Sequence, residues 1–436
     1  MRPPDLRHRA APLQLVEPVA PGDYVSWPHD YVPYVLTMAS LSTLEEAQEQ
    51  VLGHARPLPS EPVPIAAAAG RVSAEDVVAR VDLPPFASSA MDGFAVRAAD
   101  LPGKLRIAGE SAAGRPSEER LEPGSAAAIS TGAVVPKGAD AVVPIENVVL
   151  HDNDVEIAGA VGPGAHVRPR GGDVGAGEVV VPAGGTLTPA RLAAAAAAGV
   201  AELACARRPR AAVLATGSEL VAPGESLGPG QIYETNGLML AASLAAVGAE
   251  VVHEPAVADD ETALREALER GLAADVLVTS GGVSVGEHDL VRAAERELGV
   301  EEIFWRVSIK PGKPVSFGVR GDTLVFGLPG NPVSALVGCE LFVKPALRAL
   351  QGLADPLPRF EPGRLAAVLR RNEERDEFVR ARSRLDGDAL VLEPVTGQES
   401  HMIVRSAAAD ALVHIPRGNG ELAAGSTVRW LRLATG

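Results

Sequence analysis

The sequence predicts a multidomain α/β and β protein with a central doubly wound parallel α/β domain, β-rich N-terminal domains and a small C-terminal β domain. Three observations lead to this fold class. The chain has 436 residues, which at roughly 100–200 residues per domain corresponds to about two to four domains. Apolar runs alternate with helical patterns over residues 207–355, as in a parallel sheet with crossover helices. Short apolar runs between Gly and Pro turns lie on both sides of that region.

Composition excludes several classes of protein. The chain has 40 Lys and Arg against 56 Asp and Glu, and a net charge of −16 argues against a general nucleic-acid surface. Hydrophobic residues make up 46%, which excludes disorder of the whole chain. Two cysteines, Cys205 and Cys339, are too few for a disulfide scaffold or a zinc cluster, and we expect buried thiols in a cytoplasmic protein. The longest apolar run, residues 192–206, is too short to span a bilayer, and we expect no signal peptide.

The first elements are an extension and a helix. Residues 1–40 contain seven prolines, and we expect a mostly irregular N-terminal extension. The segment Ser42-Thr43-Leu44-Glu45 predicts a capping box with Ser42 at the N-cap and Glu45 at N3. Apolar residues at helical spacing follow it, and Gly53 ends the predicted helix.

Residues 41–206 are predicted to be β-rich, with a second helix near their end. A turn at residues 151–154 separates two short apolar runs and predicts a hairpin. Thr188 and Pro189 begin an Ala-rich helix that Gly199 closes, since Thr is a favoured cap, Pro suits the first turn and Gly suits the end.

Strands and helices alternate with short loops over residues 207–355. Residues 211–215 form a solidly apolar run, as a buried parallel strand should. Three further strands are predicted at residues 249–252, 276–279 and 324–328. Four helices are predicted between and after them: residues 236–247, 259–272, 289–298 and 333–350. After two prolines at 356 and 358, short strands with turns predict a separate small β domain over residues 356–436.

Three of the predicted strand ends carry loops of small residues that lead towards helices: Thr216–Glu219, Thr279–Gly286 and Leu328–Pro332. Ligands of open parallel sheets bind beyond the carboxyl ends of the strands. Glycine lets the backbone approach a ligand, and three such loops at one edge indicate a phosphate-bearing ligand. For any single loop, a tight turn with no ligand is an equal alternative. Glu287 stands where a Walker A motif needs Lys, so the second loop is no ATPase P-loop.

Charged residues lie in loops of the same region. Lys310 and Lys313 flank a Pro-Gly pair, and the proline limits the freedom of the loop that carries them. Solvated surface lysines are the alternative. Five acids also stand at loop positions: Asp92, Glu219, Asp259, Asp260 and Asp289. Such carboxylates suit Mg²⁺, which takes one or two of them together with substrate phosphates. For the aspartates at the predicted helix starts, simple capping is the alternative.

Eight motifs stand in a characteristic order along the chain: Pro85–Ala95, Ile129–Ala133, Gly138–Val142, Gly171–Val174, Thr216–Leu220, Gly281–Gly286, Lys310–Pro314 and Leu328–Ser334. Together they resemble the molybdopterin molybdenumtransferase family, MoeA, whose animal counterpart is the E domain of gephyrin. The resemblance runs from near Leu41 to the C-terminus and leaves only the extension uncovered.

The resemblance implies an elongated four-domain protein that forms a homodimer. It implies that residues 41–206 hold two domains, one inserted in the other at roughly 84–180, and that residues 207–355 bind molybdopterin. The implied reaction takes adenylylated molybdopterin and molybdate, releases AMP and yields molybdenum cofactor, assisted by Mg²⁺. The preceding adenylyltransferase and molybdoenzyme apoproteins are further implied partners, whereas nucleic acid and membrane are not.

Residues of these motifs, together with the loop acids Asp259, Asp260 and Asp289 that lie outside them, receive expected roles. Those expected to hold the pterin phosphate and the nucleotide are Thr216, Gly217, Gly281, Gly282, Ser284, Gly330, Asn331 and Ser334. Those expected to be catalytic are Asp92, Thr131, Glu219, Asp289, Lys310 and Lys313. Those expected to bind Mg²⁺ or orient water are Glu219, Asp259, Asp260 and Asp289. The lysines would neutralise phosphates or molybdate. Asp92 and Thr131 would complete the site from the partner chain, with Asp173 a weaker member of that set.

Some positions depart from the family's pattern. Ser218 stands where many relatives carry Asp, and Phe94 replaces a common Tyr, so no paired acid and no hydroxyl role is expected there. Residues 376–380 and 400–402 resemble the family only loosely, and we expect them to be structural. Two other functions remain as alternatives: the molybdopterin adenylyltransferase itself, or a scaffold or carrier of the gephyrin type that has lost the chemistry.

Overall fold

The computed structural model describes residues 41–254, 256–258, 260–282 and 290–433. The predicted extension over residues 1–40 lies outside these residues. Within them, no helix is long and apolar enough to cross a membrane.

The first helix, α1 (Leu44–His54), begins one residue later than its predicted cap. Thr43 is the N-cap: its Oγ1 accepts from Glu46 N at 3.2 Å, and Glu46 Oε2 accepts from Thr43 N at 2.8 Å. Two overlapping Ser/Thr-x-x-Glu patterns occur here, and the pattern favoured from the sequence was the wrong one. Ser42 instead forms a parallel bridge to Val307. This bridge keeps the chain extended up to residue 43, so the N-cap falls on Thr43 instead of Ser42.

A small N-terminal domain is assembled from two separate stretches of chain. Strand β1 (Ser60–Pro64) pairs with β12 (Glu202–Ala206), and β2 (Val77–Val78) pairs with β11 (Val179–Val181). The predicted second helix, α2 (Pro189–Ala197), is confirmed with Thr188 as its cap. Apolar residues from both stretches share one core.

The segment between those stretches has its own sheet, ordered β7-β4-β6-β5-β9-β8. Its strands are β4 (Gly93–Val96), β5 (Gly103–Ser111), β6 (Ser125–Ile129), β7 (Ala141–Pro144), β8 (Val149–His151) and β9 (Asp154–Ile157). Strands β8 and β9 are antiparallel, which confirms the predicted hairpin. Asp152 in its turn has a φ of +26°, and Asp is one of the few residues other than Gly that tolerate positive φ.

The central domain is a six-stranded sheet ordered β16-β13-β17-β21-β20-β18. Strands β16 (Glu250–His253), β13 (Arg210–Ala215), β17 (Val276–Ser280) and β21 (Thr323–Leu328) are parallel and confirm the four predicted strands. Strands β20 (Ser316–Arg320) and β18 (Glu301–Trp305) were not predicted, and they add an antiparallel edge. Only two residues separate β20 from β21, and Gly321 in that turn has a φ of +59°, so this connection can only form a hairpin.

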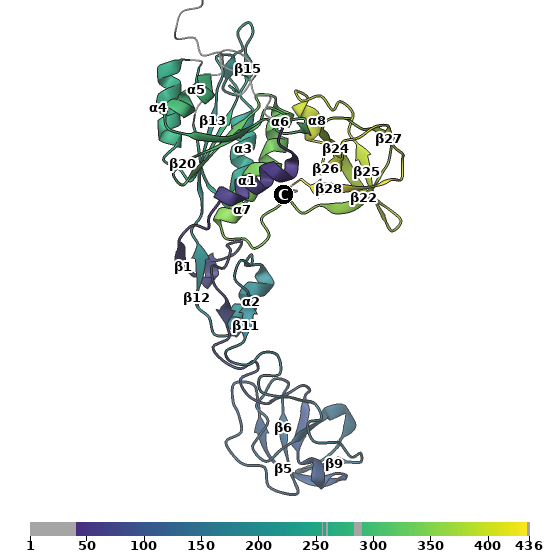
Figure 1. Ribbon diagram of the computed structural model, residues 1–436. Coiled ribbons are helices and arrows are strands. Elements are labelled where there is room, and N and C mark those ends of the chain that lie inside the picture. Colours follow the sequence, from purple (N-terminus) through teal and green to yellow (C-terminus); the bar gives the residue numbers. More distant parts are fainter. Residues whose placement is uncertain (1–40, 255, 259, 283–289, 434–436) are drawn as a thin grey trace, which may run out of the picture. The chain divides into compact units, whose positions relative to one another are not determined.

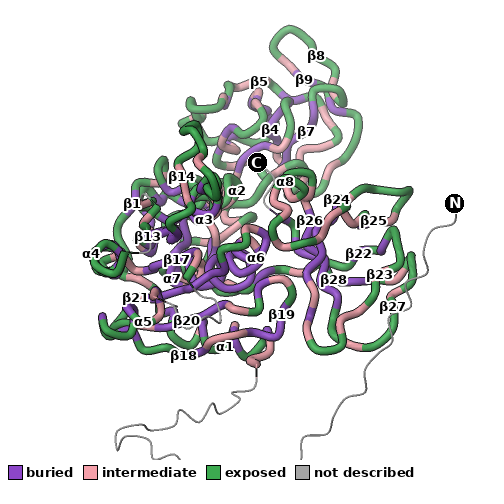
Figure 2. Tube along the Cα trace, turned by 90° about the horizontal axis from the view of Figure 1, so that it is seen from above, coloured by how far each residue is buried: buried purple, intermediate pink, exposed green. Residues whose placement is uncertain are grey.

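Helices cover both faces of the sheet, as a doubly wound fold requires (Figure 1). On one face, α3 (Asn236–Ala245), α6 (Pro332–Gly338) and α7 (Lys344–Leu350) pack against Ala211 and Val213. On the other, α4 (Glu261–Gly271) and α5 (Leu290–Glu297) pack against Ala212 and Leu214. Alternate residues of β13 therefore enter different cores, and β13, β17 and β21 are buried along most of their length (Figure 2). A π-helical turn at Cys339–Val343 joins α6 to α7.

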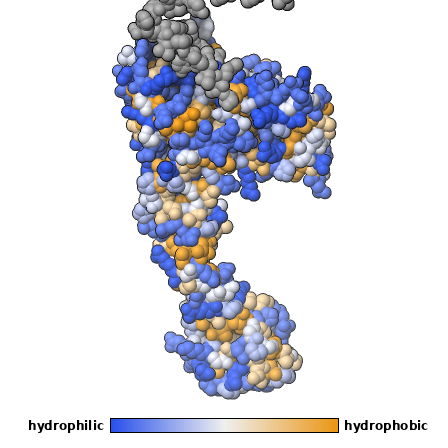
Figure 3. Space-filling view, viewed as in Figure 1, coloured by the Kyte–Doolittle hydropathy of each residue, from blue (hydrophilic) through white to orange (hydrophobic). Residues whose placement is uncertain are grey.

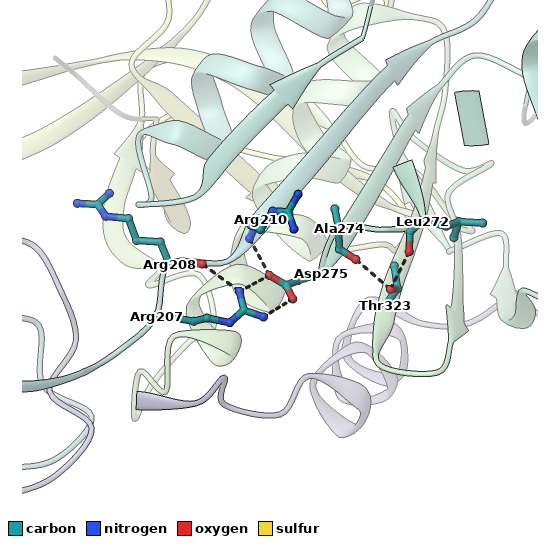
Figure 4. A network of polar contacts seen from close by, with 7 residues as sticks. All are labelled: Arg207, Arg208, Arg210, Leu272, Ala274, Asp275 and Thr323. Carbon is teal, nitrogen blue, oxygen red and sulfur yellow. Dashed lines mark hydrogen bonds and ion pairs between the residues drawn. The ribbon is translucent and has the colours of Figure 1, made fainter. Parts of the chain in front are cut away.

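A polar network joins the amino ends of these strands (Figure 4). The Arg207 guanidinium donates to both carboxylate oxygens of Asp275, at 2.6 and 2.7 Å, and Arg210 N donates at 2.8 Å. Burial alone would raise the pKa of Asp275, but the hydrogen bonds from Arg207 and Arg210 outweigh it and lower that pKa. Thr323 Oγ1 donates to Ala274 O at 2.9 Å, which ties β21 to the same edge.

The C-terminal domain is a closed β barrel. Its strands are β22 (Glu361–Leu365), β24 (Asp376–Asp386), β25 (Ala389–Pro394), β26 (Ala411–Ile415) and β28 (Thr427–Arg432). The order β24-β25-β22-β28-β26 closes because β24 also pairs with β26. Trp430 is fully buried in its core. Hydrophilic residues cover most of this domain on the face drawn in Figure 3.

Candidate functional site

The sheet topology predicts where a ligand binds in the central domain. From β13 the chain passes through α3 to β16 at the edge, and then returns through α4 to β17 on the other side of β13. The switch point therefore lies between β13 and β17, where loops leave for opposite faces of the sheet. The residues paired at the carboxyl ends are Ala215 with Ser280 and Ser280 with Leu328. The three predicted loops thus start side by side.

Described residues of these loops line a pocket of about 730 Å³, which is within the usual range for small-molecule sites of about 300–1,000 Å³. Its wall contains residues from all three loops, from the start of α3 and from the C-terminal domain. Of the predicted site residues, those that line it are Thr216, Gly217, Glu219, Gly281, Gly282, Gly330 and Asn331. The structure therefore brings seven of the sixteen predicted residues into one cavity.

Two glycines of the wall permit a close approach that a side chain would prevent. Gly281 has a φ of +97°, and an added Cβ would lie 2.5 Å from the Thr216 carbonyl oxygen. Gly282 has a φ of +65°, and its Cβ would lie 2.2 Å from Val291 Cγ2. Both positions lie in the region that favours glycine. Gly281 thus lets the second loop pack directly against the first, and Gly282 lets it pack against α5.

Glu219 is the predicted acid that the structure places in the pocket wall. Its side chain lies across Gly217, where an added Cβ would be 2.5 Å from Glu219 Oε2. The residue is exposed, and its carbonyl accepts from Ile232 N at 2.9 Å. Within the described residues, no group of three or more His, Cys, Asp and Glu side chains could hold a metal by itself. A carboxylate in this wall still fits Mg²⁺, because that ion takes one or two carboxylates and completes its shell with phosphates and water.

The predicted metal ligand Asp260 lies elsewhere. Asp260 caps α4, and its Oδ1 accepts from Ala263 N at 2.8 Å. These contacts are those of an ordinary helix cap, the alternative to metal binding considered for this residue. Asp260 does not line the pocket. Asp259, Ser284 and Asp289 lie outside the described residues.

Ser334 and Lys313 do not line the pocket, although both lie in elements next to it. Ser334 is buried within α6 and is 4% exposed. Lys313 is exposed beside Pro314, which does line the pocket.

Lys310 is held by the C-terminal domain rather than by the central sheet. The short strand β19 (Ile309–Lys310) runs parallel to β24, and Lys310 Nζ lies 3.0 Å from Glu377 Oε1. Lys310 and Glu377 line a second hollow of about 990 Å³ that also contains Arg370 and Arg371. Glu377 was expected to be only structural, whereas the structure makes it the ion-pair partner of a predicted catalytic lysine. Nothing local in the sequence signals this pairing.

Asp92 and Thr131 lie together in the domain of β4 and β6. Asp92 Oδ1 accepts from Thr131 N at 2.7 Å, and both residues are exposed. Neither lines the pocket of the central domain. Asp173 donates its backbone N–H to the Leu83 carbonyl at 2.8 Å.

Several residues of the pocket wall were not predicted from the sequence. Glu234 is 5% exposed, and its Oε1 accepts from Gly237 N at 2.6 Å. Asn236 is 8% exposed and begins α3. A polar residue before a helix is the only local signal at both positions, and it is shared with every ordinary cap. His401 also lines the pocket although its segment was expected to be structural, because Ser400 O accepts from Val333 N at 3.0 Å.

Three known protein families match consecutive parts of the chain. Residues 42–199 match the MoeA N-terminal region (domain I and II), residues 212–349 match a probable molybdopterin binding domain, and residues 362–433 match the MoeA C-terminal region (domain IV). The pocket lies mainly in the second of these stretches.

Individual relatives match nearly the whole chain. It is 40% identical over 407 residues to molybdopterin molybdenumtransferase 2 of Mycobacterium tuberculosis H37Rv, covering 90% of this chain and 99% of that protein. It is 36% identical over 396 residues to molybdopterin molybdenumtransferase of Haemophilus influenzae, covering 88% and 97%. A crystal structure of the molybdopterin biosynthesis MoeA protein from Pyrococcus horikoshii has a TM-score of 0.76 at 33% identity, covering 90% of this chain and 99% of that one.

Proposed function

The chain belongs to the molybdopterin molybdenumtransferase family, and from this premise we propose that it inserts molybdenum from molybdate into adenylylated molybdopterin with release of AMP. One observation carries the proposal beyond the family match: described residues of three small-residue loops meet at the switch point of the sheet and line a pocket of about 730 Å³. Such a pocket suits a ligand that carries phosphates between two ring systems.

The loops supply the binding surface. Gly281 and Gly282 let the backbone come close to a phosphate, and Gly330 and Asn331 bring the third loop to the same place. Thr216 and Gly217 form the wall from the first loop. Ser284 and Ser334 complete the set that we propose for the phosphate and the nucleotide.

Charge neutralisation is the main chemical demand of this reaction. Breaking the phosphoanhydride bond leaves AMP with additional negative charge beside an incoming oxyanion, so cations must face the reacting groups. We assign this task to Lys310 and Lys313. The ion pair between Lys310 and Glu377, at 3.0 Å, holds one of these ammonium groups in place before substrate arrives.

We also propose a divalent cation that helps to neutralise the substrate phosphates. Mg²⁺ bound to the substrate phosphates would neutralise part of their charge, and we propose Glu219, an exposed acid of the pocket wall, as its ligand. Asp259, Asp260 and Asp289 remain proposed ligands or water-orienting groups. Asp260 would have to give up part of its capping role to act in this way.

We further propose a homodimer in the cytoplasm. Asp92 and Thr131 form an exposed pair in another domain, and a second copy of the chain could present that pair to the pocket. Both cysteines are buried free thiols, as suits a reducing compartment. Light scattering tests the dimer, since a monomeric mass would contradict a role for Asp92 in a partner's site.

AMP release tests the proposed reaction. The purified protein is incubated with adenylylated molybdopterin and Mg²⁺, with and without molybdate, and AMP is quantified. We expect molybdate-dependent AMP release. Binding of the substrate without AMP release would instead indicate a carrier or scaffold, and formation of adenylylated molybdopterin from ATP would indicate the adenylyltransferase.

A further inference from the structure

Asn236, the first residue of α3, lines the pocket but belongs to none of the motifs that predicted the site. Its Nδ2 donates to Ser280 Oγ at 2.9 Å and to the Gly330 carbonyl at 2.8 Å. The side chain therefore joins the start of α3 to the ends of β17 and β21. With 8% of its surface exposed, it is held in one orientation.

These two hydrogen bonds distinguish the amide nitrogen of Asn236 from its amide oxygen. A backbone carbonyl can only accept, so the atom beside Gly330 O must be the amide nitrogen. Oδ1 is then the acceptor end. It is buried, and among the residues that the structure describes none donates to it.

A buried acceptor rarely lacks a donor in a folded protein. The exceptions call for a partner, and a residue in a pocket wall can find that partner in a bound ligand. Thr216 lines the same pocket and is 7% exposed. Its Oγ1 is also buried and, among the described residues, has no hydrogen-bond partner. Two unpartnered polar atoms in one wall indicate that this wall is complementary to a polar ligand edge.

We propose that Asn236 is a specificity-determining residue whose Oδ1 accepts a hydrogen bond from an exocyclic amino group on a nitrogen heterocycle of the substrate. The inference rests on the proposed function, because adenylylated molybdopterin carries such an amino group on its pterin and another on its adenine. An oxo group at the same ring position would place two acceptors face to face, which is the arrangement that a polar site rejects most strongly.

Two matched ligand pairs distinguish the rings. The full-length protein is titrated by calorimetry with AMP against IMP, and with a pterin monophosphate against the corresponding lumazine monophosphate. Each pair differs in one amino-to-oxo exchange. We expect the wild type to bind the amino member of one pair roughly 10–100-fold more tightly. In Asn236→Ala that ratio should fall to about threefold or less, and the pair that changes identifies the ring.

Two further variants separate recognition from a structural role. Leu238→Ala changes an exposed position of the same helix, 51% exposed, and should keep the wild-type ratio. Ser280→Ala removes one hydrogen-bond partner of Asn236 Nδ2 but keeps Asn236 Oδ1, so it should lower the amino-to-oxo affinity ratio only in part. This variant replaces Asn236→Ala in the test if Asn236→Ala does not fold.

Three outcomes overturn the inference. Equal weakening of all four ligands in Asn236→Ala, with unchanged ratios, would show that the residue only supports the fold. A wild type that binds without discriminating within either pair would show that no amino group is recognised. If the wild type bound neither these ligands nor adenylylated molybdopterin, the proposed function would fail together with the inference.

Discussion

Replacing Gly281 by alanine tests whether the pocket depends on close contact between two strand ends. Gly281 has a φ of +97°, and an added Cβ would lie 2.5 Å from the Thr216 carbonyl oxygen and 2.9 Å from its Oγ1. Ordinary contact needs about 3.5 Å, so the ends of β13 and β17 must move apart by about 1 Å. A displacement of that size where substrate is positioned lowers kcat/KM roughly 100-fold.

Gly299 provides a matched control within the same domain. Its φ is +83°, and no described atom lies within 4 Å of an added Cβ. Both alanine variants carry backbone strain of about 1–2 kcal/mol, but only Gly281→Ala adds steric overlap of about 1–3 kcal/mol. Gly299→Ala should therefore lower the free energy of unfolding slightly and keep its activity, whereas Gly281→Ala should lose more stability and most of its activity.

Two measurements on each variant separate these effects. Denaturant unfolding followed by circular dichroism gives the stability, and molybdate-dependent AMP release gives kcat/KM. If Gly281→Ala kept the wild-type kcat/KM while unfolding like Gly299→Ala, close contact between the strand ends would not be needed for function. The assignment of the pocket to this edge of the sheet would then be wrong.

Further predictions concern charge, burial and the lysine loop. Asp275→Asn should lower the free energy of unfolding by about 1–3 kcal/mol in denaturant titrations, and an unchanged midpoint would refute this. Folding lowers the pKa of Asp275, so its contribution is full above the unfolded pKa and is lost as pH falls through the folded pKa. Thermal midpoints of wild type and Asp275→Asn should therefore converge in acid. Lys310→Ala should keep its circular dichroism spectrum but release AMP roughly 100-fold more slowly. Glu377→Gln should raise the KM for molybdate, because Lys310 then loses its ion-pair partner. Wild-type kinetics in either variant would contradict the role assigned to that residue. Burial raises the pKa of Cys339 to about 12, so a thiol reagent should label it only after unfolding.

The parallel core of the central domain could be predicted because its strands are apolar on both faces. Ala211–Ala215 is such a run, and burial against helices on both sides follows directly from it. The antiparallel edge could not be predicted in the same way. Strand β18 has exposed and charged residues at its start, so its apolar pattern is weak, and its place depends on pairing with β20.

The site was predictable where backbone geometry requires a particular residue. Gly281 and Gly282 stand at positive φ with no room for a side chain, and such a need is visible as glycine in a strand-end loop. Asn236 was missed because the hydrogen bonds that fix its side chain join it to Ser280 and Gly330, which are distant in sequence. The same holds for Lys310, whose partner Glu377 belongs to another domain and has no local pattern that connects the two.

Transfer of molybdenum to the product tests the central claim most directly. The wild-type protein is incubated with adenylylated molybdopterin, Mg²⁺ and molybdate, and the product is then added to a molybdenum-free apoenzyme whose activity is measured. The proposed function predicts that activity appears only when molybdate was present, and that it rises in proportion to the AMP released. AMP release that proceeds equally without molybdate, and a product that never activates the apoenzyme, would show that the pocket cleaves the nucleotide without inserting the metal.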